Sequence, residues 1–318
     1  MLPAVLVLLA QGVAVLGGVQ GGARPVECGA LDGGRASNVW ERAKSPELRR
    51  YCDLLASGAA KLAGSGPMTH DVLAIADEAD HAMPGRAAPG VLRGRALARL
   101  GRFPEALAAL VSARARDERA LDEPVALLAW ARALAQAGRT KDALDAYRAL
   151  LPRASLLVTA DRGPAYVEAG LLAMGEGPGG LPGAVAIFRQ GRREAQDTGR
   201  AVAAVALALA LDRSGEKAEA KATLAALGAG EARAALEDAT LRASLGVGAA
   251  PEVFAMLGLT LEGGDAAAAR AGRDAWQRYL GSAAGSGPWA DHAREHLAER
   301  GARRPEVAHA AGAAGGHR

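Results

Sequence analysis

The sequence predicts an all-α protein built from consecutive antiparallel helix pairs, and three observations support this prediction. Half of the 318 residues are apolar, but Ala, Leu and Val supply most of this content and only 3% are aromatic. Ala and Leu have high helix propensity, whereas segments rich in β-branched and aromatic residues, which favour strands, are nearly absent. The third observation is a turn-and-helix pattern that recurs along the chain.

The recurring pattern combines the end of one helix, a polar turn with glycine and the start of the next helix. Residues 97–107 (LARLGRFPEAL) align with residues 134–144 (LAQAGRTKDAL) at an offset of 37, and residues 211–220 (LDRSGEKAEA) form a further copy. Glycine tolerates the left-handed backbone that ends a helix, and a small alanine lets two helices cross closely. These alanines are Ala106, Ala143 and Ala220.

These residues resemble the tetratricopeptide repeat family. Its consensus has a glycine in the turn, an alanine five residues later and an aromatic residue four after that, as in Gly138, Ala143 and Tyr147. Two other copies have leucine at the aromatic position, and the unit around residues 166–190 carries an insertion. The resemblance covers about residues 86–300, and it implies a right-handed α-solenoid of antiparallel helix pairs with a C-terminal capping helix.

The sequence predicts four segments. Residues 1–23 are expected to be a signal peptide, and residues 24–66 an N-terminal segment with a disulfide and the first helix, which begins at Ser45-Pro46. Residues 67–300 form the repeat domain. Residues 301–318 lack periodicity and are expected to be a disordered tail.

The apolar run from Leu2 to Val19 carries no charge and is followed by small residues, which is typical of a secretory signal peptide. No Lys or Arg precedes it, so two alternatives stay open: an uncleaved anchor in the inner membrane formed by residues 2–19, or an ordinary buried helix. The predicted location is therefore periplasmic or secreted.

The two cysteines, Cys28 and Cys52, both follow the apolar run. In an exported chain, a close pair of this kind predicts one disulfide. A loop of this size stabilises the folded state by about 3 kcal/mol in the chain-entropy model. Two unpaired buried thiols are the alternative.

Two segments match catalytic or cofactor-binding patterns, but the surrounding sequence does not support either function. Residues 175–180 fit the dinucleotide-binding pattern GxGxxG, but that site requires a preceding strand, and an inter-helix loop is expected instead. His292 and His296 fit the zinc-protease pattern HxxEH, but the sequence offers no convincing third ligand, so a solvated capping helix is expected. Adventitious metal binding by this pair with His309 and His317 is the alternative. No catalytic residue, metal or cofactor is predicted.

The resemblance also indicates which residues face a partner, because the first helix of each repeat lines a concave groove in that family. Arg95 and Arg132 are equivalent positions in successive repeats, followed one turn later by Arg99 and Gln136, and Tyr166 is expected to face the same groove. Two stacked arginines can hold a peptide carboxylate by bidentate hydrogen bonds. The alternative is that all five are ordinary solvated helix residues.

The expected function is that of an exported, non-catalytic scaffold that binds a protein or peptide of unknown identity in this groove. The net charge of +3 is spread over 38 basic and 35 acidic residues without aromatic interleaving, which argues against nucleic acid as a partner. A membrane partner follows only if residues 2–19 stay uncleaved. The alternatives are an enzyme or small-ligand-binding protein built on the helical array, and a purely structural component of an envelope complex.

Overall fold

The computed structural model describes residues 26–29, 46–64, 71–238 and 246–302. All regular secondary structure in these residues is helical, so the prediction of an all-α protein is confirmed. The predicted signal peptide lies outside the described residues, as do residues 303–318 of the predicted tail.

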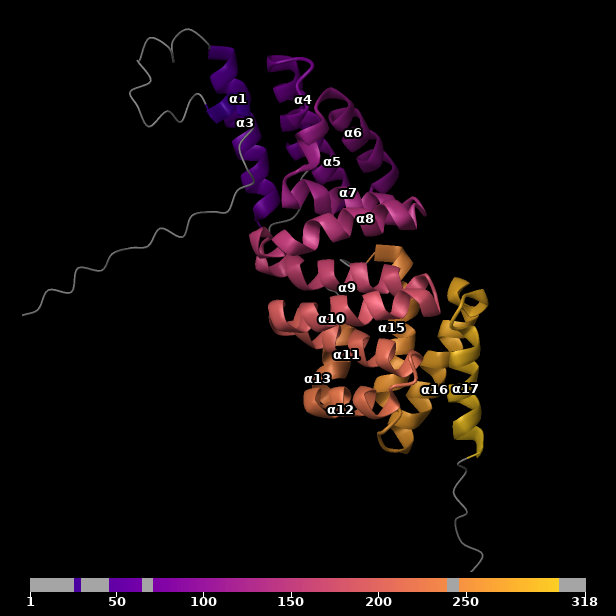
Figure 1. Ribbon diagram of the computed structural model, residues 1–318. Coiled ribbons are helices and arrows are strands. Elements are labelled where there is room, and N and C mark those ends of the chain that lie inside the picture. The colour runs from indigo at the N-terminus through magenta and orange to yellow at the C-terminus, as the bar shows by residue number, and fades with distance from the viewer. Residues whose placement is uncertain (1–25, 30–45, 65–70, 239–245, 303–318) are drawn as a thin grey trace, which may run out of the picture.

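Helices follow one another along the described chain with short connections (Figure 1). In the N-terminal half they are α1 (Val26–Gly29), α3 (Pro46–Ala63), α4 (Asp71–Ala82), α5 (Ala88–Arg99), α6 (Phe103–Arg116), α7 (Pro124–Gln136) and α8 (Thr140–Leu150). In the C-terminal half they are α9 (Thr159–Gly175), α10 (Leu181–Glu194), α11 (Asp197–Arg213), α12 (Lys217–Leu227), α13 (Ala229–Glu237), α15 (Gly246–Leu261), α16 (Ala266–Gly281) and α17 (Ala290–Ala302). Short 3-10 helices are η1 (Glu118–Leu121), η2 (Leu151–Leu156), η3 (Pro178–Gly180) and η4 (Ala283–Ser286).

The three aligned turns have the same backbone structure. Gly101, Gly138 and Gly215 have positive φ angles of 74°, 72° and 86°. In each turn, the N–H of the next residue donates to the carbonyl five residues earlier, at 2.9–3.0 Å, which closes the preceding helix in a Schellman motif. The donor and acceptor pairs are Arg102–Leu97, Arg139–Leu134 and Glu216–Leu211. The sequence alignment therefore identified a true structural repeat of the turn.

Small residues allow the helices beside these turns to approach closely. Ala106, Ala143 and Ala220 are at most 2% exposed. A Cβ atom added to Gly94 on α5 would lie 2.5 Å from Cγ of Leu110 on α6, so nothing larger than glycine fits there without movement. The region of the GxGxxG pattern is η3 between the helices α9 and α10, which confirms the expected inter-helix loop.

Consecutive helices pack in pairs, such as α5 with α6, α7 with α8, α9 with α10 and α11 with α12. The order of packing changes towards the C-terminus, because α15 packs against α16 and α13 and also against the earlier helices α7, α9 and α11. In Figure 1, α15 to α17 lie beside α9–α13 rather than beyond their end. One apolar core joins α9–α13 to α15–α17, and a second spans α5 to α9.

Candidate functional site

A cleft with a volume of about 800 Å³ opens in the N-terminal half, between α3, α5, η1, the start of α7 and η2. Its apolar wall includes the Cys28–Cys52 disulfide, Leu55, Val91, Leu92 and Val125. Its arginines are Arg86, Arg95, Arg116, Arg119 and Arg153. Its acidic residues are Glu27, Asp117, Asp122 and Glu123. Five arginines and four acidic residues give the lining a slight excess of positive charge beside its apolar wall.

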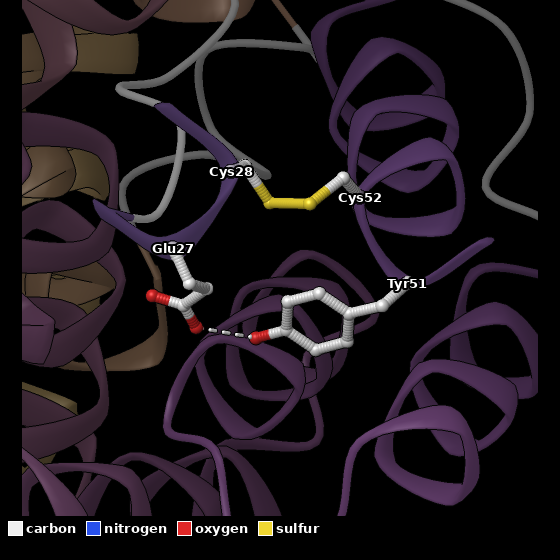
Figure 2. The surroundings of a disulfide bond; sticks show 4 residues. All are labelled: Glu27, Cys28, Tyr51 and Cys52. Atoms are coloured by element: carbon white, nitrogen blue, oxygen red, sulfur yellow. Dashed lines mark hydrogen bonds between the residues drawn. A yellow bond between two sulfur atoms is a disulfide. The ribbon is translucent and has the colours of Figure 1, made fainter. Parts of the chain in front are cut away.

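The predicted disulfide between Cys28 and Cys52 is present and joins α1 to α3 at the edge of this cleft. Figure 2 shows a second link beside it, in which the Tyr51 hydroxyl donates to Oε1 of Glu27 at 2.9 Å. Burial raises the pKa of Tyr51, and the Glu27 carboxylate raises it further, so the phenol keeps its proton. These two links hold α1 against α3, although α1 has only four residues.

Arg95 is the predicted partner-binding residue that lies in the cleft. Its side chain is half-buried, and within the described part of the chain its guanidinium forms no ion pair closer than 4 Å. Burial lowers the pKa of Arg95, while Glu123 and Asp161 act in the opposite direction from a distance. A partly desolvated guanidinium gains most from a carboxylate that completes its hydrogen bonds.

Arg132, the equivalent residue on α7, is engaged inside the protein. Its Nε donates to both carboxylate oxygens of Glu168 on α9, at 3.0 and 3.2 Å, and its Nη1 lies 3.5 Å from Oδ1 of Asp161. The Tyr147 hydroxyl also donates to Glu168. Burial alone would lower the pKa of Arg132, but the neighbouring Glu168 outweighs it and raises the pKa. The structure places Arg132 in a buried network that ties α7 and α8 to α9.

The other three predicted residues also lie outside the cleft. Arg99 donates to the carbonyls of Leu62 and Gly64, the latter at 2.9 Å, and so closes the end of α3. Tyr166 is fully buried, and its hydroxyl donates to Oε2 of Glu194 at 2.6 Å. Gln136 is half-buried at the end of α7. The five predicted residues therefore do not form one continuous row.

A second polar cluster lies in the C-terminal half, where the histidines of the HxxEH pattern are buried although a solvated capping helix was expected. Only 7% of the His296 side chain and 13% of the His292 side chain are exposed. Nε2 of each imidazole lies 2.8 Å from the same oxygen, Oδ2 of Asp212 on α11. Helix α17 therefore packs two histidines into the protein, whereas Glu295 between them is exposed.

Aromatic rings and further carboxylates surround these histidines. Trp276 on α16 stacks on His296 with ring centroids 4.7 Å apart. Nδ1 of His296 donates to Oε1 of Glu262 at 2.7 Å, and Nε1 of Trp276 donates to the same oxygen at 2.9 Å. Beside them, the buried Arg213 forms an ion pair of 2.9 Å with Glu252.

The charges of this cluster stabilise one another. Burial alone would lower the pKa of His296, but the hydrogen bonds to Asp212 and Glu262 outweigh it and raise the pKa to about 9. Burial raises the pKa of Asp212, but the two histidines more than offset this and hold it below its ordinary value. Within the described residues, Asp212, His292 and His296 are the group able to present three metal-ligating atoms, all within 4.8 Å of one another.

Sequence reasoning named the histidines but missed Asp212, Glu262 and Arg213. Asp212 and Arg213 appeared only as members of a repeat copy. The sequence did contain a signal that these two residues are buried. They directly follow the apolar run AVAAVALALAL of α11, which has no polar face for solvent.

No known protein-family model matches the chain, and no curated protein is similar to it at a significant level. Within the residues that the structure describes, no helix combines the length and the apolar character needed to cross a membrane.

Proposed function

We propose that this protein is an exported, non-catalytic interaction scaffold that binds an acidic segment of a protein or peptide partner in the arginine-lined cleft. The observation that carries this proposal is Arg95, a half-buried guanidinium that lies in a cleft of about 800 Å³ and has no close ion pair among the described residues. The partner supplies a carboxylate to Arg95 and packs apolar side chains on the wall formed by the disulfide, Leu55 and Val91.

The rim of the cleft supports a protein partner. Leu156 lines the cleft and is 57% exposed, which is unusual for a large apolar side chain among the residues that the structure describes. Arg86 and Arg119 are exposed on the other elements of the cleft and extend its positive charge. An apolar contact beside several cations suits a segment in which acidic and apolar residues alternate.

The proposed architecture is a solenoid of helix pairs that resembles the tetratricopeptide repeat family. Its support is the repeated Schellman turn at Gly101, Gly138 and Gly215, together with the buried alanine five residues after each glycine. In this proposal α15 covers the inner face of the solenoid along α7, α9 and α11. The portion of that face next to α3 and α5 stays accessible as the cleft. The binding surface is therefore shorter than the full row of repeats.

Export to the periplasm or the extracellular space belongs to the same proposal. The Cys28–Cys52 disulfide is compatible with an oxidising compartment. The apolar segment 2–19, which carries the export signal or the alternative inner-membrane anchor, lies outside the described residues.

Selection of peptides from a random library on the full-length protein tests the cleft, followed by measurement of the affinity of a labelled peptide. We expect acidic peptides to be selected. Arg95→Ala should weaken their binding by about 1.5–3 kcal/mol, which is the range for a charge-assisted hydrogen bond. Arg114→Ala is the matched control, because Arg114 is exposed on the neighbouring α6 and lies outside the cleft.

Equal affinity of the selected peptide for wild type and Arg95→Ala would contradict the proposal. The volume of the cleft also falls in the range of about 300–1,000 Å³ that small-molecule sites occupy. A small anionic ligand that competes with the peptide and depends on Arg95 would identify the alternative, a ligand-binding protein. A further outcome is occupation by the chain's own N-terminal residues, in which case a variant lacking residues 1–25 binds the peptide more tightly than the full chain.

A further inference from the structure

We propose that Asp212, His292 and His296 form a binding site for one divalent transition-metal ion of the zinc type, and that this ion fastens α17 to α11. This site is separate from the proposed partner cleft. The two histidines are four residues apart and so lie on one face of α17. Both direct Nε2 towards Oδ2 of Asp212, which belongs to a helix 80 or more residues earlier in the sequence.

The distances suit a tetrahedral ion. Both nitrogens lie 2.8 Å from Asp212 Oδ2, and the three ligand atoms fall within 4.8 Å of one another. Zn–N and Zn–O distances of about 2.0–2.2 Å place ligand atoms of a tetrahedral ion about 3.3–3.5 Å apart. Each Nε2–Oδ2 distance therefore has to lengthen by only about 0.5–0.7 Å to surround an ion.

His292 lacks the hydrogen bonds that a buried imidazole needs. Neither Nδ1 nor Nε2 has a hydrogen-bond partner within the described part of the chain, and both atoms are inaccessible to solvent. Nε2 lies close to Asp212, but without the alignment of a hydrogen bond. An unsatisfied buried polar group destabilises a fold, and coordination of a cation would satisfy Nε2.

The surroundings of His296 are those of a metal-bound histidine. When Nδ1–H donates to Glu262, Nε2 presents its lone pair towards Asp212 and the proposed ion. This carboxylate–histidine–metal arrangement fixes the tautomer and raises the basicity of the ligand nitrogen. Trp276 holds Glu262 by its Nε1 hydrogen bond and stacks on the imidazole, so the ring has one orientation.

The ligand types select the class of ion and its role. Two imidazoles with one carboxylate suit Zn²⁺ and its neighbours in the transition series, whereas Mg²⁺ and Ca²⁺ prefer oxygen ligands throughout. Three protein ligands leave the fourth position of a tetrahedral ion to water. Glu295, the residue that would act as general base in a protease of the HxxEH pattern, is exposed and on a different face of α17. An open fourth position is more typical of catalytic zinc. The structural role proposed here rests instead on the exposure of Glu295 and on the link that the ion makes between α11 and α17.

The test uses the untagged full-length protein, stripped with a chelator and then titrated with ZnCl₂ by calorimetry. We expect one Zn²⁺ per chain and a rise in Tm on binding. Co²⁺ should give the intense visible absorption of a tetrahedral site with nitrogen and oxygen ligands. Glu262→Gln changes the carboxylate that orients His296 and accepts from Trp276, and it should weaken Zn²⁺ binding by about 10-fold to 100-fold.

His292→Gln is the decisive variant, because it removes one ligand nitrogen of the proposed site. It also removes the imidazole that lies 2.8 Å from Asp212 Oδ2, so a lower Tm than that of wild type is expected without metal. Added Zn²⁺ should no longer raise the Tm of this variant. The matched controls are His81→Gln on the exposed side of α4 and the double variant His309→Ala/His317→Ala, both of which should keep one tight site.

Three results would overturn the proposal. They are the absence of stoichiometric Zn²⁺ binding to wild type, unchanged binding by the folded His292→Gln variant, and loss of binding in the His309→Ala/His317→Ala variant. The first result means that Asp212, Glu262 and the histidines form an ion-paired network only. The last means that any bound ion is held by the tail.

Discussion

The N-terminal cleft and the C-terminal histidine cluster use charged residues in opposite ways. In the cleft, Arg95 lies against an apolar wall and has no close ion pair among the described residues. In the cluster, Asp212, Glu262 and His296 satisfy one another behind Trp276, which is fully buried. Burial alone therefore does not identify a binding residue. A charged group is available to a partner only where the fold leaves its hydrogen bonds incomplete and its surface reachable.

The largest effect on stability is expected where a substitution removes the partner of a charge that is already paired inside the protein. Glu168→Ala leaves the half-buried Arg132 with only the more distant Asp161, at 3.5 Å, and we expect a loss of about 3 kcal/mol in the free energy of unfolding. Urea denaturation followed by circular dichroism measures this loss. Asp142→Ala, which removes the exposed partner of Arg139, should cost at most about 1 kcal/mol. A loss of similar size in both variants would mean that Arg132 is not structural.

The disulfide tests whether the wall of the cleft depends on a covalent link. Cys28→Ser/Cys52→Ser should lower the free energy of unfolding by about 3 kcal/mol, because the bond closes a loop across a sequence separation of 24. Peptide binding should weaken in parallel, since this bond and the Glu27–Tyr51 hydrogen bond both hold α1 to α3. A variant that keeps both stability and peptide affinity would show that α1 is not needed for the cleft.

The pH dependence of stability sharpens the description of the histidine cluster. The pKa of His296 is about 9 in the folded protein and about 6.5 when unfolded, so the folded state binds the proton more tightly. Its stabilisation is fully present below pH 6.5 and is lost as the pH rises through 9. In chelator, wild type should lose up to about 3 kcal/mol over this interval. Denaturation curves of His296→Gln should show a smaller loss, and equal losses would contradict the assigned contacts.

The smallest change in stability is expected for Arg95→Ala, because a residue reserved for a partner contributes little to the fold. Arg95→Ala removes a partly desolvated guanidinium without breaking an ion pair among the described residues, so stability should change by less than about 0.5 kcal/mol. Thermal unfolding of the two proteins measures the difference. A loss as large as that of Glu168→Ala would show that Arg95 supports the fold and would remove it as a binding residue.

The repeat could be predicted from the sequence because its causes are local. The turn at Gly138 needs a left-handed residue and the crossing at Ala143 needs a small one, and both needs are visible within ten residues. The pairing of Cys28 with Cys52 was also predictable, since the chain has only these two cysteines.

The candidate sites were less predictable because their partners are distant in sequence. Arg95 and Arg132 occupy equivalent repeat positions, but Glu168, which is 36 residues after Arg132, pairs with that one alone. Asp212 meets His296 across 84 residues, and this contact requires α15 and α16 to fold back beside α11. No periodicity in α17 indicates which helix will cover its histidines.

Hydrogen–deuterium exchange of the full-length protein with and without a selected acidic peptide shows where the partner binds. We predict that the peptide protects amides of residues 88–95 and 118–125, which border the cleft, and leaves residues 252–302 unchanged. Protection confined to residues 252–302, with exchange around Arg95 unaltered, would contradict this prediction.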